Sequence, residues 1–159
     1  MIRIVAVACL LFLSTLAIAA NAEGETGATG AIGRHQDSVV GVWIVHHSTA
    51  PFPYHMYVFN ADGTMQQANP DAGNASRSDS DAKGVWAARR GHVVGKWVEI
   101  SADRATHRYS GRGELTFDIA VKGDRLDGTA SFIGYDPDGK VVAGPLPAPF
   151  TGTRVTVPK

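Results

Sequence analysis

The chain has 159 residues, of which 44% are hydrophobic and 19% are charged, with 15 basic and 15 acidic side chains. This balance leaves no net charge, so it gives no electrostatic reason to expect nucleic acid or an anionic membrane surface as a partner. The one cysteine, Cys9, lies in the apolar N-terminal segment, which excludes disulfides, thiol chemistry and thiolate-bound metals from the rest of the chain.

The N-terminal segment has the pattern of a secretory signal peptide. Arg3 gives it a positive start, residues 4–18 are almost uninterruptedly apolar, and residues 20–22 (Ala-Asn-Ala) form a small-x-small cleavage site. Cleavage after Ala19 would move the mature start by three residues. A membrane anchor is disfavoured because a spanning helix needs about 20 apolar residues and a basic flank usually follows it. We therefore expect a signal peptide at 1–22, an exported protein that is secreted or periplasmic, and no membrane span in the mature chain.

The rest of the chain has the length of one domain. Residues 23–37 are rich in Gly, Ala, Thr and Glu without hydrophobic periodicity, which predicts a flexible leader. The folded domain is expected over 38–159. There, turn sequences rich in Gly, Asp, Asn and Pro recur at short intervals and separate segments rich in β-branched and aromatic residues, which is typical of short strands joined by hairpins.

The pattern predicts an all-β fold without helices. Strands are expected at 40–47, 54–60, 64–68, 84–89, 92–101, 107–121, 125–135, 140–144 and 150–157. Eight or nine antiparallel strands must close or stack to cover their edges. The short sequential turns favour a single meandering antiparallel β-barrel over a sandwich.

Two segments interrupt the strand pattern. Residues 69–83 are dominated by Asn, Asp, Ser, Ala and Gly, and are expected to form a long surface loop, either a tolerated insertion or a lid at the barrel mouth. Residues 144–149 alternate proline with small or apolar residues, which predicts an extended connector that crosses over the barrel or borders its mouth.

A Gly-Val-Trp triplet opens two of the predicted strands, at 41–43 and at 84–86. Glycine allows close backbone approach at a strand start, and an indole two residues later can fill or line one end of a barrel. Trp43 and Trp86 are therefore candidates both for core packing and for ligand contact.

Successive side chains of a strand point to opposite faces, and this alternation indicates which polar residues could face the barrel interior. If Trp43 faces inward, His47 shares its face. In the next strand, either the set with His55 and Tyr57 or the set with Tyr54 and Met56 faces inward. Further on, Trp97 and Glu99 share one face, and the opposite face would bury Lys96.

Metal and nucleotide chemistry have no motif in this sequence. Neighbouring strand residues such as His46 and His47 point to opposite faces and cannot share a metal, and no H-x-H or H-E-x-x-H spacing occurs. Nucleophile-elbow, phosphate-loop and dinucleotide motifs are absent as well. We therefore expect neither a metal site nor a cofactor.

The Gly-x-Trp at the start of the first strand, behind a secretion signal and ahead of an all-β meander, resembles lipocalins and the wider group of lipocalin-like barrels. The stretch 84–100, with its second Gly-x-Trp, is similar in outline to bacterial lipocalin-like and allene-oxide-cyclase-like barrels. The resemblance implies a cavity for an apolar small molecule.

Three functional hypotheses follow. The first is a secreted barrel that binds a small hydrophobic molecule, with His47 and Glu99 as polar contacts and an aromatic lining. That lining consists of Trp43, Tyr57, Trp86 and Trp97. The second is a cofactor-independent lyase, isomerase or cyclase in which His47 and Glu99 act as base and acid. The third is a structural or inhibitory module that acts through its loops. The sequence alone leaves the choice between enzyme and binding protein, and the oligomeric state, open.

Overall fold

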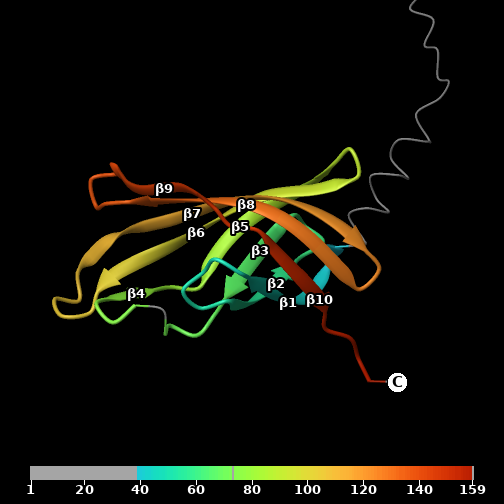
Figure 1. Cartoon of the computed structure of the whole chain (residues 1–159), viewed down its shortest axis with the longest axis horizontal. Coiled ribbons are helices and arrows are strands. Elements are labelled where there is room, and N and C mark those ends of the chain that lie inside the picture. The colour runs from blue at the N-terminus through green and yellow to red at the C-terminus, as the bar shows by residue number, and fades with distance from the viewer. Residues whose placement is uncertain (1–38, 73, 159) are drawn as a thin grey trace, which may run out of the picture.

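The computed structural model describes residues 39–72 and 74–158 (Figure 1). The signal peptide predicted for 1–22 and the leader predicted for 23–37 lie outside the described residues. Ten strands make up the regular structure of the described part. They are β1 (Gly41–His47), β2 (Tyr54–Phe59), β3 (Thr64–Ala68), β4 (Arg77–Asp79), β5 (Ala82–Arg89), β6 (His92–Asp103), β7 (Tyr109–Lys122), β8 (Arg125–Tyr135), β9 (Val141–Pro147) and β10 (Phe150–Arg154).

Eight of these strands close into an antiparallel barrel. They follow one another in the order β10, β1, β2, β3, β5, β6, β7, β8, and β8 pairs again with β10. At this seam Trp43 of β1 pairs with Arg154 of β10, and Gly128 of β8 pairs with Phe150. Closure removes the unpaired edges that an open sheet would expose. The predicted single meandering antiparallel barrel is confirmed, with two further strands beside it.

The two further strands extend one end of the barrel. β4 pairs with the last three residues of β6, and β9 pairs with the second half of β8, beyond the part of β8 that contacts β10. In Figure 1, β6, β7 and β8 run together past the ends of β1 and β2, with β9 along one side and β4 along the other. This end, with the segments 48–53 and 69–76, is called the open end.

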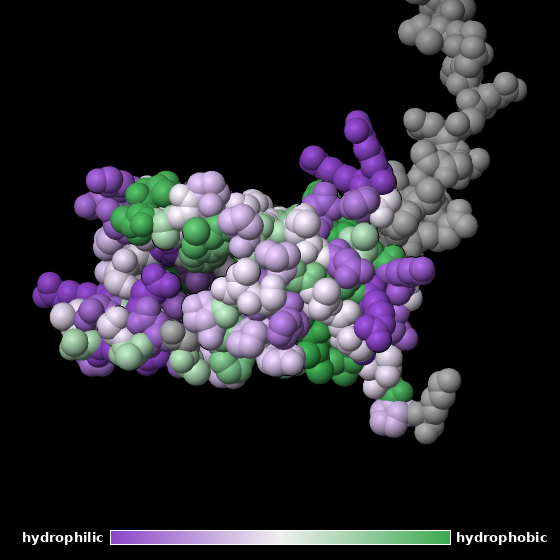
Figure 2. All heavy atoms as spheres, viewed as in Figure 1, coloured by the Kyte–Doolittle hydropathy of each residue, from purple (hydrophilic) through white to green (hydrophobic). Residues whose placement is uncertain are grey.

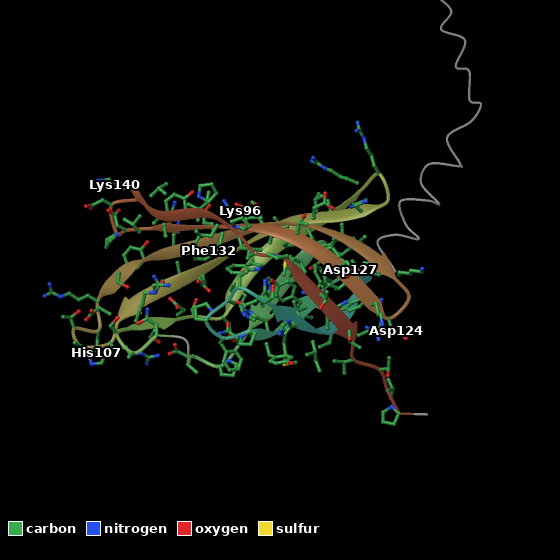
Figure 3. The ribbon with its side chains drawn as sticks, viewed as in Figure 1. Lys96, His107, Asp124, Asp127, Phe132 and Lys140 are labelled. Carbon is green, nitrogen blue, oxygen red and sulfur yellow. The ribbon has the colours of Figure 1, made fainter. Side chains whose placement is uncertain are left out.

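The opposite end, where the β5–β6 and β7–β8 turns lie, is called the closed end. Figure 3 shows the separation of the two ends, with Asp124 and Asp127 near the closed end and His107 and Lys140 at the open end. The β5–β6 turn has positive φ at Arg90 (50°) and Gly91 (88°), as in the hairpin turns whose twist matches that of the flanking strands.

Alternation of side chains explains why the long strands form. In β7, Leu115, Phe117 and Ile119 are buried, while Thr116 and Asp118 between them are exposed. One face of the strand therefore contributes to the barrel interior and the other to the solvated surface. The strand runs unbroken from Tyr109 to Lys122.

The interior of the barrel is filled by an aromatic cluster. The Phe59 ring meets the Trp86 and Phe117 rings edge to face, at centroid distances of 5.9 and 6.0 Å. Such pairs stabilise a core by about 0.5–1.5 kcal/mol beyond the burial of their area. The closed half of the barrel is therefore a packed core.

The polar segment 69–83 differs from its prediction as a long loop. Arg77–Asp79 forms β4, and β5 already begins at Ala82. Polar contacts hold this segment in a defined conformation. The Asn74 side-chain oxygen accepts hydrogen bonds from the Ser76 backbone and hydroxyl and from the Arg77 backbone. β4 then pairs with the overhang of β6, which composition alone does not reveal.

The surface of the molecule mixes polar and apolar side chains (Figure 2). Hydrophobic residues gather at the outer end of β9, where Val141 and Val142 are 50% and 63% exposed. In the part of the chain that the structure describes, no helix has the length and hydropathy to cross a membrane.

Candidate functional site

The open end of the barrel holds a cavity of about 460 Å³. Its size lies within the range of about 300–1,000 Å³ that small-molecule sites occupy. Its wall combines the inward faces of β6, β7 and β8 with the segments that border the mouth, and Figure 3 shows Phe132 between the strands of this half. The apolar part of the lining consists of Ala50, Pro51, Phe52, Trp97, Leu115, Phe132, Leu146, Pro147 and Ala148.

A hydrogen-bonded group of three side chains lies at the bottom of this cavity. The Trp97 indole N–H donates to the Tyr57 hydroxyl (3.1 Å), and the same hydroxyl lies 2.9 Å from His47 Nε2. An indole N–H can only donate, so the Tyr57 hydroxyl accepts from it, and we assign the buried hydroxyl proton to His47 Nε2, the acceptor beside it. The neutral His47 ring then carries its proton on Nδ1.

Burial fixes the protonation states of this group. Desolvation, with smaller contributions from His55 and His46, lowers the pKa of His47 to about 3. Desolvation also raises the pKa of the Tyr57 hydroxyl well above its usual value. At neutral pH, His47 is thus an uncharged ring whose Nε2 lone pair already has a partner, which makes it a hydrogen-bond donor through Nδ1 and a poor proton acceptor.

A second chain of hydrogen bonds fixes the border of the mouth. His55 Nε2 donates to the Phe52 carbonyl (2.8 Å), so its Nδ1 is free to accept from the Gln67 amide (2.8 Å). The same Gln67 nitrogen donates to the Asn69 side chain (2.5 Å). Burial lowers the pKa of His55, which agrees with a neutral ring. These contacts tie the segment after β1 to β2 and β3.

Glu99 is the titratable group with the most unusual surroundings. It lines the cavity, and burial, together with repulsion from Asp79, raises its pKa to about 7, against a smaller opposing effect of Arg77. Gly113 on β7 makes room for it, since a Cβ there would lie 2.6 Å from Glu99 Oε1. At neutral pH this carboxyl group exists in both protonation states, so it can donate or accept.

The acidic and basic groups at the rim, unlike Glu99, have partners. Asp79 accepts a hydrogen bond from the Ser101 hydroxyl (2.6 Å) and lies 3.1 Å from Arg77 Nε, an ion contact without hydrogen-bond alignment. Asp71 pairs with Arg104 at 2.7 Å. These pairs attach β4 and the preceding segment to the overhang of β6.

The structure brings only some of the predicted site residues together. His47, Trp97 and Glu99 line the cavity, and Tyr57 lies beneath it through its hydroxyl. The inward set on β2 is the one that contains His55 and Tyr57. On β6, Lys96 faces outward and pairs with Glu114, which leaves Trp97 and Glu99 on the inner face.

Trp43 and Trp86 are not among the residues that line this cavity. Trp43 lies at the closed end, where its indole donates to the Val39 carbonyl (2.8 Å) and the Arg154 guanidinium covers its ring at 4.2 Å. The Trp86 indole donates to two backbone carbonyls of the β2–β3 turn. Both residues belong to the packed core, which is the structural alternative that the sequence left open for them.

Several lining residues were missing from the predicted site. Leu115 and Phe132 carried a signal, because both lie on the apolar face of alternating strands. Leu146 and Pro147 belong to the proline-rich segment that was expected to cross over or to border the mouth, and they border it. No sequence pattern indicated that Arg77 lines the cavity, because its position depends on the pairing of β4 with β6.

A second hollow, a groove of about 520 Å³ that is more open to solvent, lies on the outer wall between β1, β7, β8 and β10. It contains His46 and Asp127, and a hydrogen bond of 2.6 Å between His92 Nδ1 and the Asp118 carboxyl group. Both partners of that contact are more than half exposed, so it contributes little to stability. Within 39–72 and 74–158, no three His, Cys, Asp or Glu side chains gather closely enough to hold a metal ion.

Comparison with known proteins gave no match among family models, curated proteins or solved structures. The fold and the geometry of the open end are therefore the basis for the functional argument.

Proposed function

We propose that this protein binds a small, mainly apolar molecule in the cavity at the open end of its barrel. A closed β-barrel with a buried aromatic cluster is compatible with ligand binding. Trp97, Leu115 and Phe132 would supply apolar contact, while Glu99 and the Nδ1 proton of His47 would orient the polar end of the ligand. The resemblance to lipocalin-like barrels agrees with this role, and the N-terminal segment supports export, so we propose that the protein acts outside the cytoplasm.

The observation that carries the proposal is the contrast between the cavity and the core beside it. The closed half of the barrel is filled by large side chains, whereas the open half leaves about 460 Å³ between apolar walls. Protein interiors normally pack without voids of this size. A cavity whose wall combines apolar side chains with polar groups that can orient a ligand is the usual form of a small-molecule site.

A neutral apolar dye, N-phenylnaphthylamine, provides the test. We expect saturable binding at one site, with a blue shift and an increase in dye emission. Ala50→Trp, which adds bulk at the cavity wall, should weaken binding by at least about tenfold, because steric filling of a pocket removes the ligand contacts. Ala87→Trp on the exposed face of β5 is the matched control and should bind like the wild type. Absence of saturable binding, or equal binding by both variants, would contradict the proposal.

A second candidate function is acid-base catalysis on the bound molecule. It is favoured by one observation, the pKa of about 7 for Glu99 inside the cavity, because a general acid or base works best when its pKa lies near the working pH. His47 is a poor partner for this chemistry, since its Nε2 lone pair accepts from Tyr57 and its pKa is about 3. Glu99 would therefore have to act as both acid and base.

Glu99→Gln separates the two candidates. For a binding protein, the variant should keep the affinity for the neutral dye within a few-fold. For an enzyme, it should in addition abolish turnover of any substrate identified by mass spectrometry of the protein purified from its own source, because Gln cannot exchange a proton.

A further inference from the structure

The charges around the cavity are not balanced. Four charged side chains line it, namely Asp71, Arg77, Asp79 and Glu99. Asp71 pairs with Arg104, which lies outside the lining, and Asp79 pairs with Arg77. For Glu99, the structure records neither a salt bridge nor a hydrogen bond with any described residue. One carboxyl group on the wall therefore forms no ion pair, and Arg77 has only a weaker electrostatic effect on it.

The other titratable groups of the cavity leave no unpaired positive charge for an anion. The guanidinium of Arg77 lies against Asp79, and burial keeps the His47 and His55 rings neutral. An anionic ligand would meet Glu99 without a compensating positive charge, which disfavours its binding. The charge that this wall can accept is positive.

The wall also limits the kind of cation. A metal ion needs several ligands, and no three His, Cys, Asp or Glu side chains of the described residues gather closely enough to hold one, whereas Trp97, Leu115 and Phe132 line the same cavity as Glu99. Such surroundings suit a cation on an organic frame, because aromatic side chains also attract an ammonium group. The absence of a side chain at Gly113 leaves the space in which the carboxyl group lies. The position of the Glu99 carboxyl group thus depends on a glycine in the neighbouring strand.

We infer that the ligand of the open-end cavity is an organic ammonium compound, with its charged nitrogen at Glu99 and its apolar part against Trp97, Leu115 and Phe132. This inference rests on the proposed function, and it names the chemical class of the ligand. Binding of the ammonium group completes the pair that Glu99 lacks, and it favours the ionised form of the carboxyl group.

Three probes of equal length test the inference by calorimetry on the full chain at pH 7.5. They are 4-phenylbutylammonium, 4-phenylbutanol and 4-phenylbutanoate. We expect the ammonium compound to bind at least about tenfold more tightly than the alcohol, and the carboxylate to bind most weakly, because a partly desolvated charge pair is worth more than about 1.4 kcal/mol.

Two variants test whether the preference for the ammonium compound depends on Glu99. Glu99→Gln should abolish the preference for the ammonium compound over the alcohol, because it removes the charge and keeps the size of the side chain. Glu114→Gln, the same substitution on the outer face of β7, is the matched control and should keep the preference. If Glu114→Gln also loses it, the charge recognised is not that of Glu99, and the inference is wrong.

The wild-type protein gives an independent readout that needs no variant. Between pH 8 and pH 5.5, protons compete for Glu99, and the ammonium affinity should fall by up to about 30-fold while the alcohol affinity stays constant. The charged and titratable groups that share the cavity with Glu99 are Arg77 and Asp79 on β4, Asp71 before β4, His47 on β1 and His55 on β2. Burial lowers the pKa of both histidines, and hydrogen bonding lowers that of Asp71, so Glu99 dominates this range.

The outcomes separate this inference from the proposed function. Equal binding of the three probes, or preference for the carboxylate, would overturn the ammonium assignment while the binding function stands. Failure of all three probes and of the neutral dye would overturn both.

Discussion

At the closed end of the barrel, the indoles of Trp43 and Trp86 donate to backbone carbonyls, whereas at the open end the indole of Trp97 donates to the Tyr57 side chain. The backbone partners belong to the segment just before β1 and to the β2–β3 connection, so the closed-end tryptophans fix the architecture. The Tyr57 hydroxyl in turn donates a hydrogen bond to His47 on the cavity wall. The same residue type thus serves the fold at one end and the surface of a cavity at the other.

The two ends also differ in whether their charged side chains have partners. The Arg154 guanidinium at the closed end covers a tryptophan ring and lies 3.2 Å from Asp124, whereas Glu99 at the open end has neither an ion pair nor a hydrogen bond with the described residues. An unpaired carboxyl group in a buried place reduces stability. An ammonium ligand of the kind proposed above would offset this loss, because it would supply the partner of the carboxyl group.

The largest expected effect tests the structural role of the closed end. Trp43→Ala should reduce the free energy of unfolding by about 3–5 kcal/mol, because it leaves a cavity in a packed core. Urea denaturation measures this loss. Ile44→Ala, at a half-exposed position on the outer face of the same strand, should change stability by less than about 1 kcal/mol. A Trp43→Ala variant that is as stable as Ile44→Ala would contradict the assignment of Trp43 to the core.

A second prediction compares glycines of the two halves. Gly113→Ala should destabilise the fold by about 1–3 kcal/mol, because the new Cβ would meet Glu99 Oε1 and the Phe132 ring, both at 2.6 Å. Gly152→Ala, whose Cβ would lie closest to the Leu126 side chain, at 2.8 Å, should cost a similar amount. Only Gly113→Ala should weaken dye binding, since Glu99 and Phe132 line the cavity. The comparison fails if both variants bind the dye equally well.

The smallest effect concerns Glu99 and has a definite sign with pH. Because its folded-state pKa of about 7 lies above its ordinary value, its contribution to stability is complete below about pH 4.5 and is lost as the pH rises through 7. Glu99→Gln removes this loss, so the stability of the variant relative to the wild type should rise by about 1–2 kcal/mol between pH 5 and pH 8.

Denaturant unfolding at the two pH values measures this difference. Glu114→Gln is the control with the opposite expectation, because Lys96 and Arg112 lower the pKa of Glu114. Its variant should be less stable than the wild type at pH 8. A Glu99→Gln variant with no pH-dependent gain would mean that the Glu99 carboxyl group is well solvated in the folded protein.

The fold could be predicted from the sequence because period-two alternation and turn residues are local signals. Residues of β7 such as Leu115 and Phe117 show one apolar face whatever the rest of the chain does. Alternation does not say which end of the barrel an inward residue occupies. Trp43, at the start of its strand, and His47, at its end, share a face but lie at opposite ends of the barrel.

The environment of Glu99 could not be predicted for a different reason. It depends on strands that are distant in sequence, since β4 places Asp79 near it and Gly113 on β7 provides its space. β4 itself lies in a polar segment without hydrophobic alternation, and it is ordered by hydrogen bonds of Asn74 and by pairing with β6. Long-range pairing of polar strands leaves no periodic trace in a single sequence.

The pairing of Trp43 with Arg154 has a practical consequence for handling the protein. The described chain enters β1 and leaves β10 at the same end of the barrel, and this is the end opposite the cavity. A tag, a fluorophore or a surface linker joined near Arg154 would therefore hold the molecule with its cavity facing solution. The barrel can be immobilised in one orientation without obstructing its mouth.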